Sequence, residues 1–211
     1  TYGSSIMNKS KYNLVLASAS PRRKELLKSC FLNFSIEVSD IDENLSGHSP
    51  IELVQLLALK KAKAILEKTM VSEPIVLGSD TIVVLENKIL GKPKDKEDAK
   101  KMLQSLSGKT HTVVTGVAIV SKERTIHFYE ETTVTFESIT TDLLELYLAT
   151  EESLDKAGSY GIQGAALSFI KTVEGSYSNV VGLPVNRLLL EIKKFIGYET
   201  SEKGEWRELF N

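Results

Sequence analysis

Leu14-Val-Leu-Ala-Ser-Ala-Ser-Pro-Arg-Arg-Lys-Glu-Leu-Leu27 sets a strand pattern directly before a helix pattern near the start of the chain. The apolar run from Leu14 to Ala17 predicts a buried strand. Ser20 and Pro21 are typical of the N-cap and the first position of a helix. Strand and helix patterns alternate in the same way along the rest of the chain, which predicts an α/β protein.

The first turn of this predicted helix carries Arg22, Arg23 and Lys24. The helix macrodipole favours negative charge there, by roughly 0.3–1 kcal/mol per residue. Another predicted helix follows the rule, because Asp95-Lys-Glu-Asp98 opens it with carboxylates. Cations beside free backbone N–H groups suit a polyanion such as phosphate. The two arginines therefore indicate a phosphate site, and the alternative is that both side chains extend into water.

The composition is that of an ordinary globular protein. Of the 211 residues, 42% are hydrophobic and 26% are charged, enough for one large domain or two closely joined lobes. The formal net charge of −2 argues against nucleic acid polymers and anionic membranes as partners. A single cysteine, Cys30, cannot form an internal disulfide, which fits a reducing compartment. No apolar run approaches the ~20 residues that a membrane span needs.

We expect a single domain from residue 11 to residue 197. It is preceded by an N-terminal segment, 1–10, and followed by a tail, 198–211. The first six residues could derive from an expression vector and are set aside in predicting the fold. Trp206 and Phe210 in the tail predict a segment that docks on the domain.

A carboxylate interrupts the most apolar strand pattern of the chain. Asp80 lies inside Pro74-Ile-Val-Leu-Gly-Ser-Asp-Thr-Ile-Val-Val-Leu85, where a charge is costly unless it is paired, hydrogen-bonded or bound to metal. Gly78 would let the backbone bend or approach a ligand closely. The acidic run Asp40-Ile-Asp-Glu43 could join Asp80 in holding Mg²⁺, which takes oxygen ligands. The alternatives are a polar loop and a hydrogen-bonded Asp in a turn.

Two lysines could supply further positive charge. Lys92, in Gly91-Lys-Pro93, would be presented from a corner that the proline stiffens. Lys61 lies beside the apolar stripe of a predicted helix and could point along a cleft wall. Either lysine by itself is a weak signal, because lysines are usually solvated. The three histidines have no ligand-like spacing, which argues against a zinc site or a His-based triad.

Six segments, in this order along the chain, resemble the Maf family of nucleoside triphosphate pyrophosphatases. They are Leu16-Ala-Ser-Ala-Ser-Pro-Arg-Arg23, Gly78-Ser-Asp-Thr-Ile-Val83, Gly91-Lys-Pro93, Leu106-Ser-Gly108 with Thr115-Gly116, Asp155-Lys-Ala-Gly-Ser-Tyr-Gly-Ile-Gln-Gly164 and Gly175-Ser-Tyr-Ser-Asn-Val-Val-Gly-Leu-Pro184. The resemblance implies an α/β fold like that of the inosine triphosphate pyrophosphatases, with a long mixed β-sheet flanked by helices in two lobes and a central cleft. It also implies hydrolysis of a nucleoside triphosphate to the monophosphate and pyrophosphate, with Mg²⁺ or Mn²⁺. Family members are typically cytoplasmic and often homodimeric.

Within the family, the chain resembles the branch that hydrolyses dTTP and UTP. That branch has Arg after Ser-Pro, Thr after the key Asp, and Gln in a Gly-Ile-Gln-Gly segment. These positions correspond to Arg22, Thr81 and Gln163, which the resemblance implies tune the substrate. The branch that acts on 7-methyl-GTP has Trp and Gln at the first two positions. A role in clearing modified pyrimidine nucleotides from nucleotide pools is part of the same expectation.

The resemblance also implies roles for other residues. Asp80 is expected either to accept a proton from water or, with Glu43, mainly to hold the metal. One carboxylate cannot easily do both on one metal, and the sequence does not decide between the two roles. The other positions expected to line the phosphate site are Ser18, Arg23, Lys61 and Lys92. Ser79 departs from the Ala that is common in this branch.

Two other classes of function stay open. One is a non-enzymatic, nucleotide-binding regulator of cell division or septum formation. The other is a different phosphohydrolase, such as a phosphomonoesterase. The second is less favoured because no His or Cys is placed as a covalent phosphate acceptor.

Overall fold

The computed structural model describes residues 11–198 and 205–211. The predicted N-terminal segment, 1–10, lies outside the described residues, and so do residues 199–204 of the predicted tail. The strands of the described part are β1 (Asn13–Leu16), β2 (Ser35–Ile36), β3 (Pro74–Leu85), β4 (Lys88–Leu90), β5 (Thr110–Val120), β6 (Thr125–Phe136) and β7 (Ile170–Glu174). Its helices are α1 (Pro21–Lys28), α2 (Pro50–Lys68), α3 (Lys96–Leu106), α4 (Thr141–Leu148), α5 (Tyr177–Val181), α6 (Val185–Phe195) and the short 3₁₀ helices η1 (Ala157–Ser159), η2 (Ala165–Ser168) and η3 (Trp206–Leu209).

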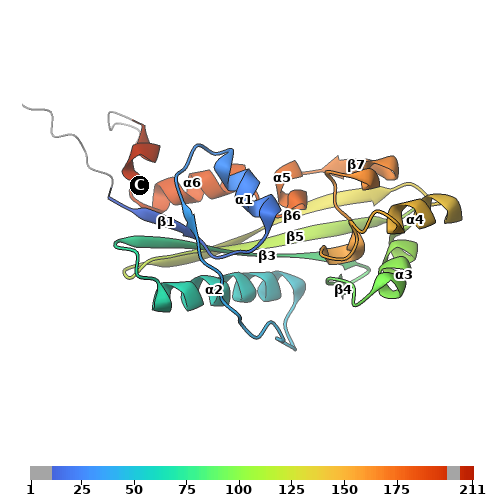
Figure 1. Cartoon of the computed structure of the whole chain (residues 1–211), viewed down its shortest axis with the longest axis horizontal. Coiled ribbons are helices and arrows are strands. Elements are labelled where there is room, and N and C mark those ends of the chain that lie inside the picture. Colours follow the sequence, from blue (N-terminus) through green and yellow to red (C-terminus); the bar gives the residue numbers. More distant parts are fainter. Residues whose placement is uncertain (1–10, 199–204) are drawn as a thin grey trace, which may run out of the picture.

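One mixed sheet runs the length of the molecule (Figure 1). Its strand order is β2-β1-β3-β5-β6-β7, and β4 pairs with the end of β3. β1 is parallel to both β2 and β3, whereas the other strand pairs are antiparallel. This mixed sheet with flanking helices confirms the predicted α/β class.

Helices cover both faces of the half of the sheet that contains β1 and β2. α2 lies on one face, and α1 and α6 lie on the other (Figure 1). Side chains of a strand alternate between faces, so Val76 of β3 packs with Ala58 of α2 while its neighbour Leu77 packs with Leu188 of α6. We refer to this half as the first lobe. None of the helices in the described part of the chain is both long and apolar enough to span a membrane.

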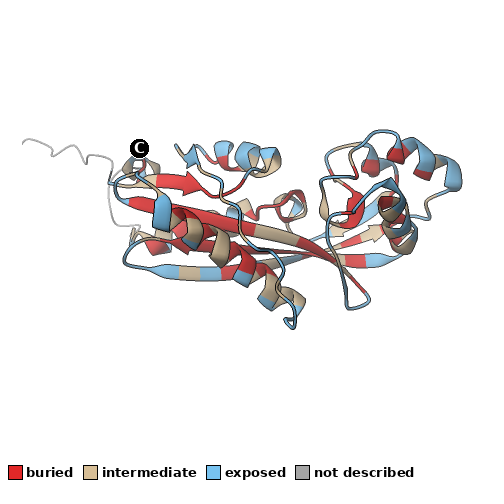
Figure 2. Cartoon of the chain, turned by 60° about the horizontal axis from the view of Figure 1, so that its bottom comes forward, coloured by how far each residue is buried: buried red, intermediate tan, exposed pale blue. Residues whose placement is uncertain are grey.

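The second lobe is the other half of the molecule, with α3, α4 and β7 around the far ends of the long strands. Its core contains Val83 of β3, Val113 of β5 and Phe136 of β6. The same three strands contribute to the core of the first lobe, and buried residues follow them through both lobes (Figure 2). The two lobes therefore share one continuous sheet.

Two glycines allow α2 to lie unusually close to the sheet. A Cβ atom on Gly78 of β3 would overlap the carbonyl oxygen of Ala58, and one on Gly116 of β5 would overlap that of Val54. Gly78 was expected to permit bending or a close ligand. The structure shows that the missing side chain of Gly78 instead leaves room for the backbone of α2. This close approach places Lys61 of α2 beside Asp80 of β3.

The last described residues lie against the first lobe. Tyr12, just before β1, forms an isolated parallel bridge with Phe210. Trp206 and Phe210 are both buried in the first-lobe core.

Candidate active site

A cleft opens where one edge of the sheet is interrupted. On this edge β1 pairs with β3 as far as Leu77, and β4 pairs with β3 from Val83 to Leu85. Among the described residues, no strand pairs with residues 78–82 on that side. The carboxyl end of β1 lies at this gap, which is where α/β sheets commonly bind ligands. The cleft here has a volume of about 1090 Å³ and is lined by residues of both lobes.

All the site residues predicted from the sequence line this one cleft. They are Ser18, Arg22, Arg23, Glu43, Lys61, Asp80, Thr81, Lys92 and Gln163. They come from the start of α1, the loop before α2, α2 itself, β3, the corner after β4 and the loop before η2. The fold thus brings together residues that are far apart in the sequence.

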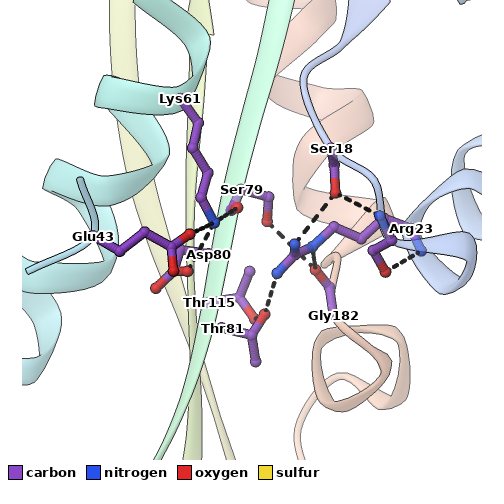
Figure 3. Close-up of polar contacts among 10 residues, drawn as sticks. Ser18, Arg23, Glu43, Lys61, Ser79, Asp80, Thr81, Thr115 and Gly182 are labelled. Carbon is purple, nitrogen blue, oxygen red and sulfur yellow. Dashed lines mark hydrogen bonds and ion pairs between the residues drawn. The ribbon is translucent and has the colours of Figure 1, made fainter. Parts of the chain in front are cut away.

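Asp80 faces α2, because it lies two residues after Gly78 on the same face of β3. Its Oδ1 atom is 3.0 Å from Nζ of Lys61, and Oε1 of Glu43 is 3.4 Å from the same nitrogen (Figure 3). The side chains of Asp80 and Lys61 are 15% and 18% exposed, whereas that of Glu43 is 60% exposed. Lys61 also donates to the backbone oxygen of Ser79. Two carboxylates therefore converge on one positive charge.

Arg23 lies on the opposite face of β3, and each of its three guanidinium nitrogens donates a hydrogen bond. Its Nε donates to the backbone oxygen of Gly182 at 2.8 Å, Nη2 donates to the hydroxyl of Thr81 at 3.0 Å and Nη1 to that of Ser18 at 3.5 Å (Figure 3). Burial lowers the pKa of Arg23, and the charge of Asp80 opposes this change. Arg23 therefore ties the start of α1 to β3 and to the end of α5.

Arg22 points in another direction, toward the second lobe. The helix begins as predicted, with Ser20 as N-cap accepting from the backbone N–H of Arg23 and with no acid in the first turn. Nη1 of Arg22 is 3.4 Å from Oδ2 of Asp155. Neither arginine extends freely into water, so that alternative is excluded.

The acidic and basic residues just before η1 are part of the site, although no role was predicted for them from the sequence. Asp155 and Lys156 line the cleft with Glu152, and Nζ of Lys156 is 2.8 Å from Oδ1 of Asp155. Burial raises the pKa of Asp155, but the hydrogen bond and charge of Lys156, with those of Arg22, outweigh it and the net shift is downward. An adjacent acid and base at the start of a three-glycine loop was the signal that could have revealed them.

Lys92 and Gln163 have side chains that are ready for a ligand. Both are exposed, and neither side chain makes a hydrogen bond or ion pair with another residue in the described part of the chain. The corner that carries Lys92 is held in place, because Gly91 accepts a hydrogen bond from the backbone of Gly158 at 3.1 Å and Pro93 is buried.

A buried aromatic cluster supports the loop that carries Gln163. Tyr160 lines the cleft, and its hydroxyl is 2.6 Å from Nε2 of His111. Phe136 packs edge-on against both rings. The hydroxyl of Tyr147 accepts from the backbone N–H of Gly161 at 3.2 Å. Burial lowers the pKa of His111 to about 4, so this cluster is uncharged at neutral pH.

The cleft has no net excess of positive charge. Its lining contains five Lys or Arg residues and six Asp or Glu residues, and several of the cations are already paired. A polyanion such as a triphosphate would therefore need additional positive charge to bind well. In the described residues no group of three or more His, Cys, Asp or Glu side chains could hold a metal alone.

Comparisons with known proteins show which sequences and structures this chain is similar to. A family model described as Maf-like protein matches residues 13–195. A dTTP/UTP pyrophosphatase of Bacillus cytotoxicus is 53% identical over 182 residues, which cover 86% of this chain and 94% of that protein. A protein of the same name from Bacillus cereus is 52% identical over 183 residues, with coverage of 86% and 95%. Among solved structures, the Ham1 protein of Staphylococcus aureus is 17% identical, with a TM-score of 0.43 over 59% of this chain and 71% of that one.

Proposed function

Because the chain belongs to the Maf family, we propose that it is a nucleoside triphosphate pyrophosphatase that converts dTTP and UTP to the monophosphate and pyrophosphate. Modified pyrimidine nucleotides are included in the proposal, so that the enzyme would clear unwanted nucleotides from the pool. The observation that carries it is the convergence of Arg22, Lys61 and Asp80 from three elements on one cleft between two lobes. Its relatives named dTTP/UTP pyrophosphatase support the choice of base.

The basic residues would bind the phosphates. Lys92 has no ion-pair partner among residues 11–198 and 205–211. The pairs of Arg22 with Asp155 and of Lys61 with Glu43 include carboxylates that are mostly exposed. Such pairs are weak, so these cations can exchange a carboxylate for phosphate oxygens at little cost. Arginine suits this task, because its planar group meets two oxygens at once. Most of the rate enhancement would come from positive charge placed where negative charge develops.

A divalent cation fits the two carboxylates on the α2 side. Asp80 and Glu43 already converge on the ammonium group of Lys61, so the site accepts a cation, and carboxylate oxygens are the ligands that Mg²⁺ and Mn²⁺ prefer. Asp80 and Glu43 would hold the metal, with phosphate oxygens as further ligands. When bound, it would neutralise phosphate charge and polarise the phosphorus that is attacked.

Asp80 would also act on the attacking water. Its carboxylate is held by Lys61 and faces the cleft, so it can orient the water and accept its proton. Gln163 would read the base, because an amide presents a donor and an acceptor side by side to the matching edge of a pyrimidine. Thr81 is fixed by hydrogen bonds with Arg23 and Thr115. It would shape the floor of the cleft between Asp80 and Gln163.

A panel of nucleoside triphosphates with identification of products tests this proposal. We expect pyrophosphate and the monophosphate from dTTP and UTP in the presence of Mg²⁺ or Mn²⁺, and little turnover after chelation. Binding without any release of pyrophosphate would favour a non-enzymatic regulator. Release of single phosphate would favour a phosphomonoesterase.

The same proposal includes a cytoplasmic homodimer that binds neither nucleic acid polymers nor membranes, as the family resemblance implies. Analytical ultracentrifugation of the purified chain tests the dimer directly. Sedimentation as a monomer at micromolar concentrations would remove it.

A further inference from the structure

One ion pair spans the cleft and joins the two lobes. Arg22 belongs to the first turn of α1 in the first lobe, and Asp155 belongs to the segment between α4 and η1 in the second. Their separation is 3.4 Å, and their side chains are 25% and 63% exposed. Such an exposed pair adds little to stability by itself. Its importance depends on what else Asp155 contacts.

Asp155 is held by a lysine that is itself fixed. Nζ of Lys156 is 2.8 Å from Oδ1 of Asp155 and donates to the backbone oxygen of Glu152 at 2.7 Å. The Lys156 side chain is only 17% exposed. Its aliphatic stem lies against Gly161, where an added Cβ atom would be 2.7 Å from Cε of Lys156. Lys156 therefore connects the ion pair to the first glycine of the Gly-Ile-Gln-Gly segment.

The second glycine of that segment is fixed in a similar way. The carboxylate of Glu152 accepts from the backbone N–H of Ala165 at 3.3 and 3.2 Å. A Cβ atom on Gly164 would overlap this carboxylate. Gln163 thus projects from a segment whose two ends rest on Lys156 and Glu152. The contacts run without interruption from Arg22, through Asp155, to the support of Gln163.

We propose that Asp155, together with Lys156, is a positioning residue that fixes Arg22 of the first lobe relative to Gln163 of the second. The inference rests on the proposed function, in which Arg22 meets phosphate and Gln163 meets the base. The covalent structure of the nucleotide limits the distance between its phosphates and its base. Holding Arg22 and Gln163 at a matching distance therefore favours nucleotides whose phosphates reach Arg22 while the base reaches Gln163. Asp155 stays bound to Lys156 when Arg22 turns to phosphate, so the support of Gln163 persists during the reaction.

Enzyme kinetics on single and double variants test the coupling. Asp155→Asn keeps the shape of the side chain but removes its charge. We expect it to lower the ratio of kcat/KM for dTTP to that for dGTP by about five- to tenfold, in the range found for coupled residues. In a background of Arg22→Ala the same change should lower the ratio by less than about twofold. Asp155→Glu, which restores the charge, should recover much of the ratio.

The control is an ion pair of similar exposure outside the cleft. Nζ of Lys100 is 3.0 Å from Oε1 of Glu145, which is 57% exposed. Glu145→Gln should leave the dTTP to dGTP ratio unchanged. Equal effects of Asp155→Asn with and without Arg22 would overturn the inference, and so would an equal effect of the control.

A second measurement does not depend on turnover. Amide hydrogen exchange of the ligand-free protein reports on the backbone of residues 161–165. Asp155→Asn should speed exchange there by about threefold or more, because it breaks the contact with Lys156 that supports this segment, whereas Arg22→Ala leaves that contact in place and should change exchange little. Unchanged exchange in Asp155→Asn would overturn the inference even if the wild-type protein hydrolyses dTTP. Absence of hydrolysis with faster exchange would instead contradict the proposed function.

Discussion

Asp80 and Thr81 are neighbours in β3, yet they contact cationic side chains on opposite sides of the sheet, and each of these comes from a different helix. Nζ of Lys61 in α2 is 3.0 Å from Asp80, and Nη2 of Arg23 in α1 is 3.0 Å from the hydroxyl of Thr81 (Figure 3). Strand alternation alone produces this division. The interrupted edge of β3 lets one cleft reach both sides, so the two cations act on one space.

Asp80→Asn should lower kcat for dTTP by about 10²–10⁴-fold, because it removes the proton acceptor and a metal ligand. The amide oxygen can still accept from Lys61, so the melting temperature should change little. Steady-state kinetics and thermal unfolding check both expectations.

The matched control for this change is Asp142→Asn in the exposed first turn of α4, which should leave kcat unchanged. If Asp80→Asn keeps near-normal turnover, Asp80 has no part in the chemistry.

Arg22 and Arg23 should differ sharply when each is replaced by alanine. Arg23→Ala removes the hydrogen bonds that a buried guanidinium group donates to Gly182 and Thr81, so the free energy of unfolding should fall by about 2–4 kcal/mol. Arg22→Ala removes only an exposed ion pair and should cost less than about 1 kcal/mol, while it raises KM for the triphosphate. Urea unfolding and kinetics on both variants separate the two roles; equal losses of stability would contradict the different burial of the two side chains.

Gly78→Ala should destabilise the protein by about 1–3 kcal/mol, because the added methyl group pushes α2 away from the sheet. Turnover should fall with it, since Lys61 moves with the helix. Gly91→Ala is the control for stability, because no atom lies within 4 Å of the added Cβ. Similar urea midpoints for the two variants would show that α2 tolerates displacement.

His111 should make stability depend on pH in the acid range. The pKa of this side chain is lowered from 6.5 to about 4 by burial, so between these values the unfolded chain binds a proton that the folded one does not. The free energy of unfolding should therefore decrease as pH falls through this window, by about 3 kcal/mol at most.

His111→Phe should flatten that part of the pH profile in urea unfolding experiments. The variant loses the hydrogen bond to Tyr160 and should be less stable at pH 7. The two proteins are therefore compared by how steeply the free energy of unfolding changes with pH, and not by its value at one pH. An identical slope in both proteins would assign the acid sensitivity to other groups.

Much of the fold could be predicted from local signals. Ser20 and Pro21 mark the start of α1, and the turn at Glu86 and Asn87 leads into β4, because these positions depend on capping and turn chemistry within a few residues. The α/β class and the mixed sheet follow from the alternation of patterns and from the family resemblance. That all nine candidate residues line one cleft agrees with the family motifs.

The remaining features depend on contacts between distant segments. The alternation of Phe34, Ile36 and Val38 resembles a longer strand, yet only Ser35–Ile36 pairs, and Ile36 and Val38 are exposed at the edge of the sheet. Nothing local shows that Gly78 meets a helix. The opposite environments of Arg22 and Arg23 arise from Asp155 and Gly182, which come from far along the chain.

Continuity of β3, β5 and β6 through both lobes limits how the protein can move. Enzymes that close over a substrate usually rotate rigid bodies about a short hinge. Here such a rotation would have to bend three hydrogen-bonded strands at once, so hinge closure of one lobe onto the other is disfavoured. Access to the cleft should instead be governed by small rearrangements of surface loops and charged side chains, and crystals grown without nucleotide should accept one by soaking without cracking.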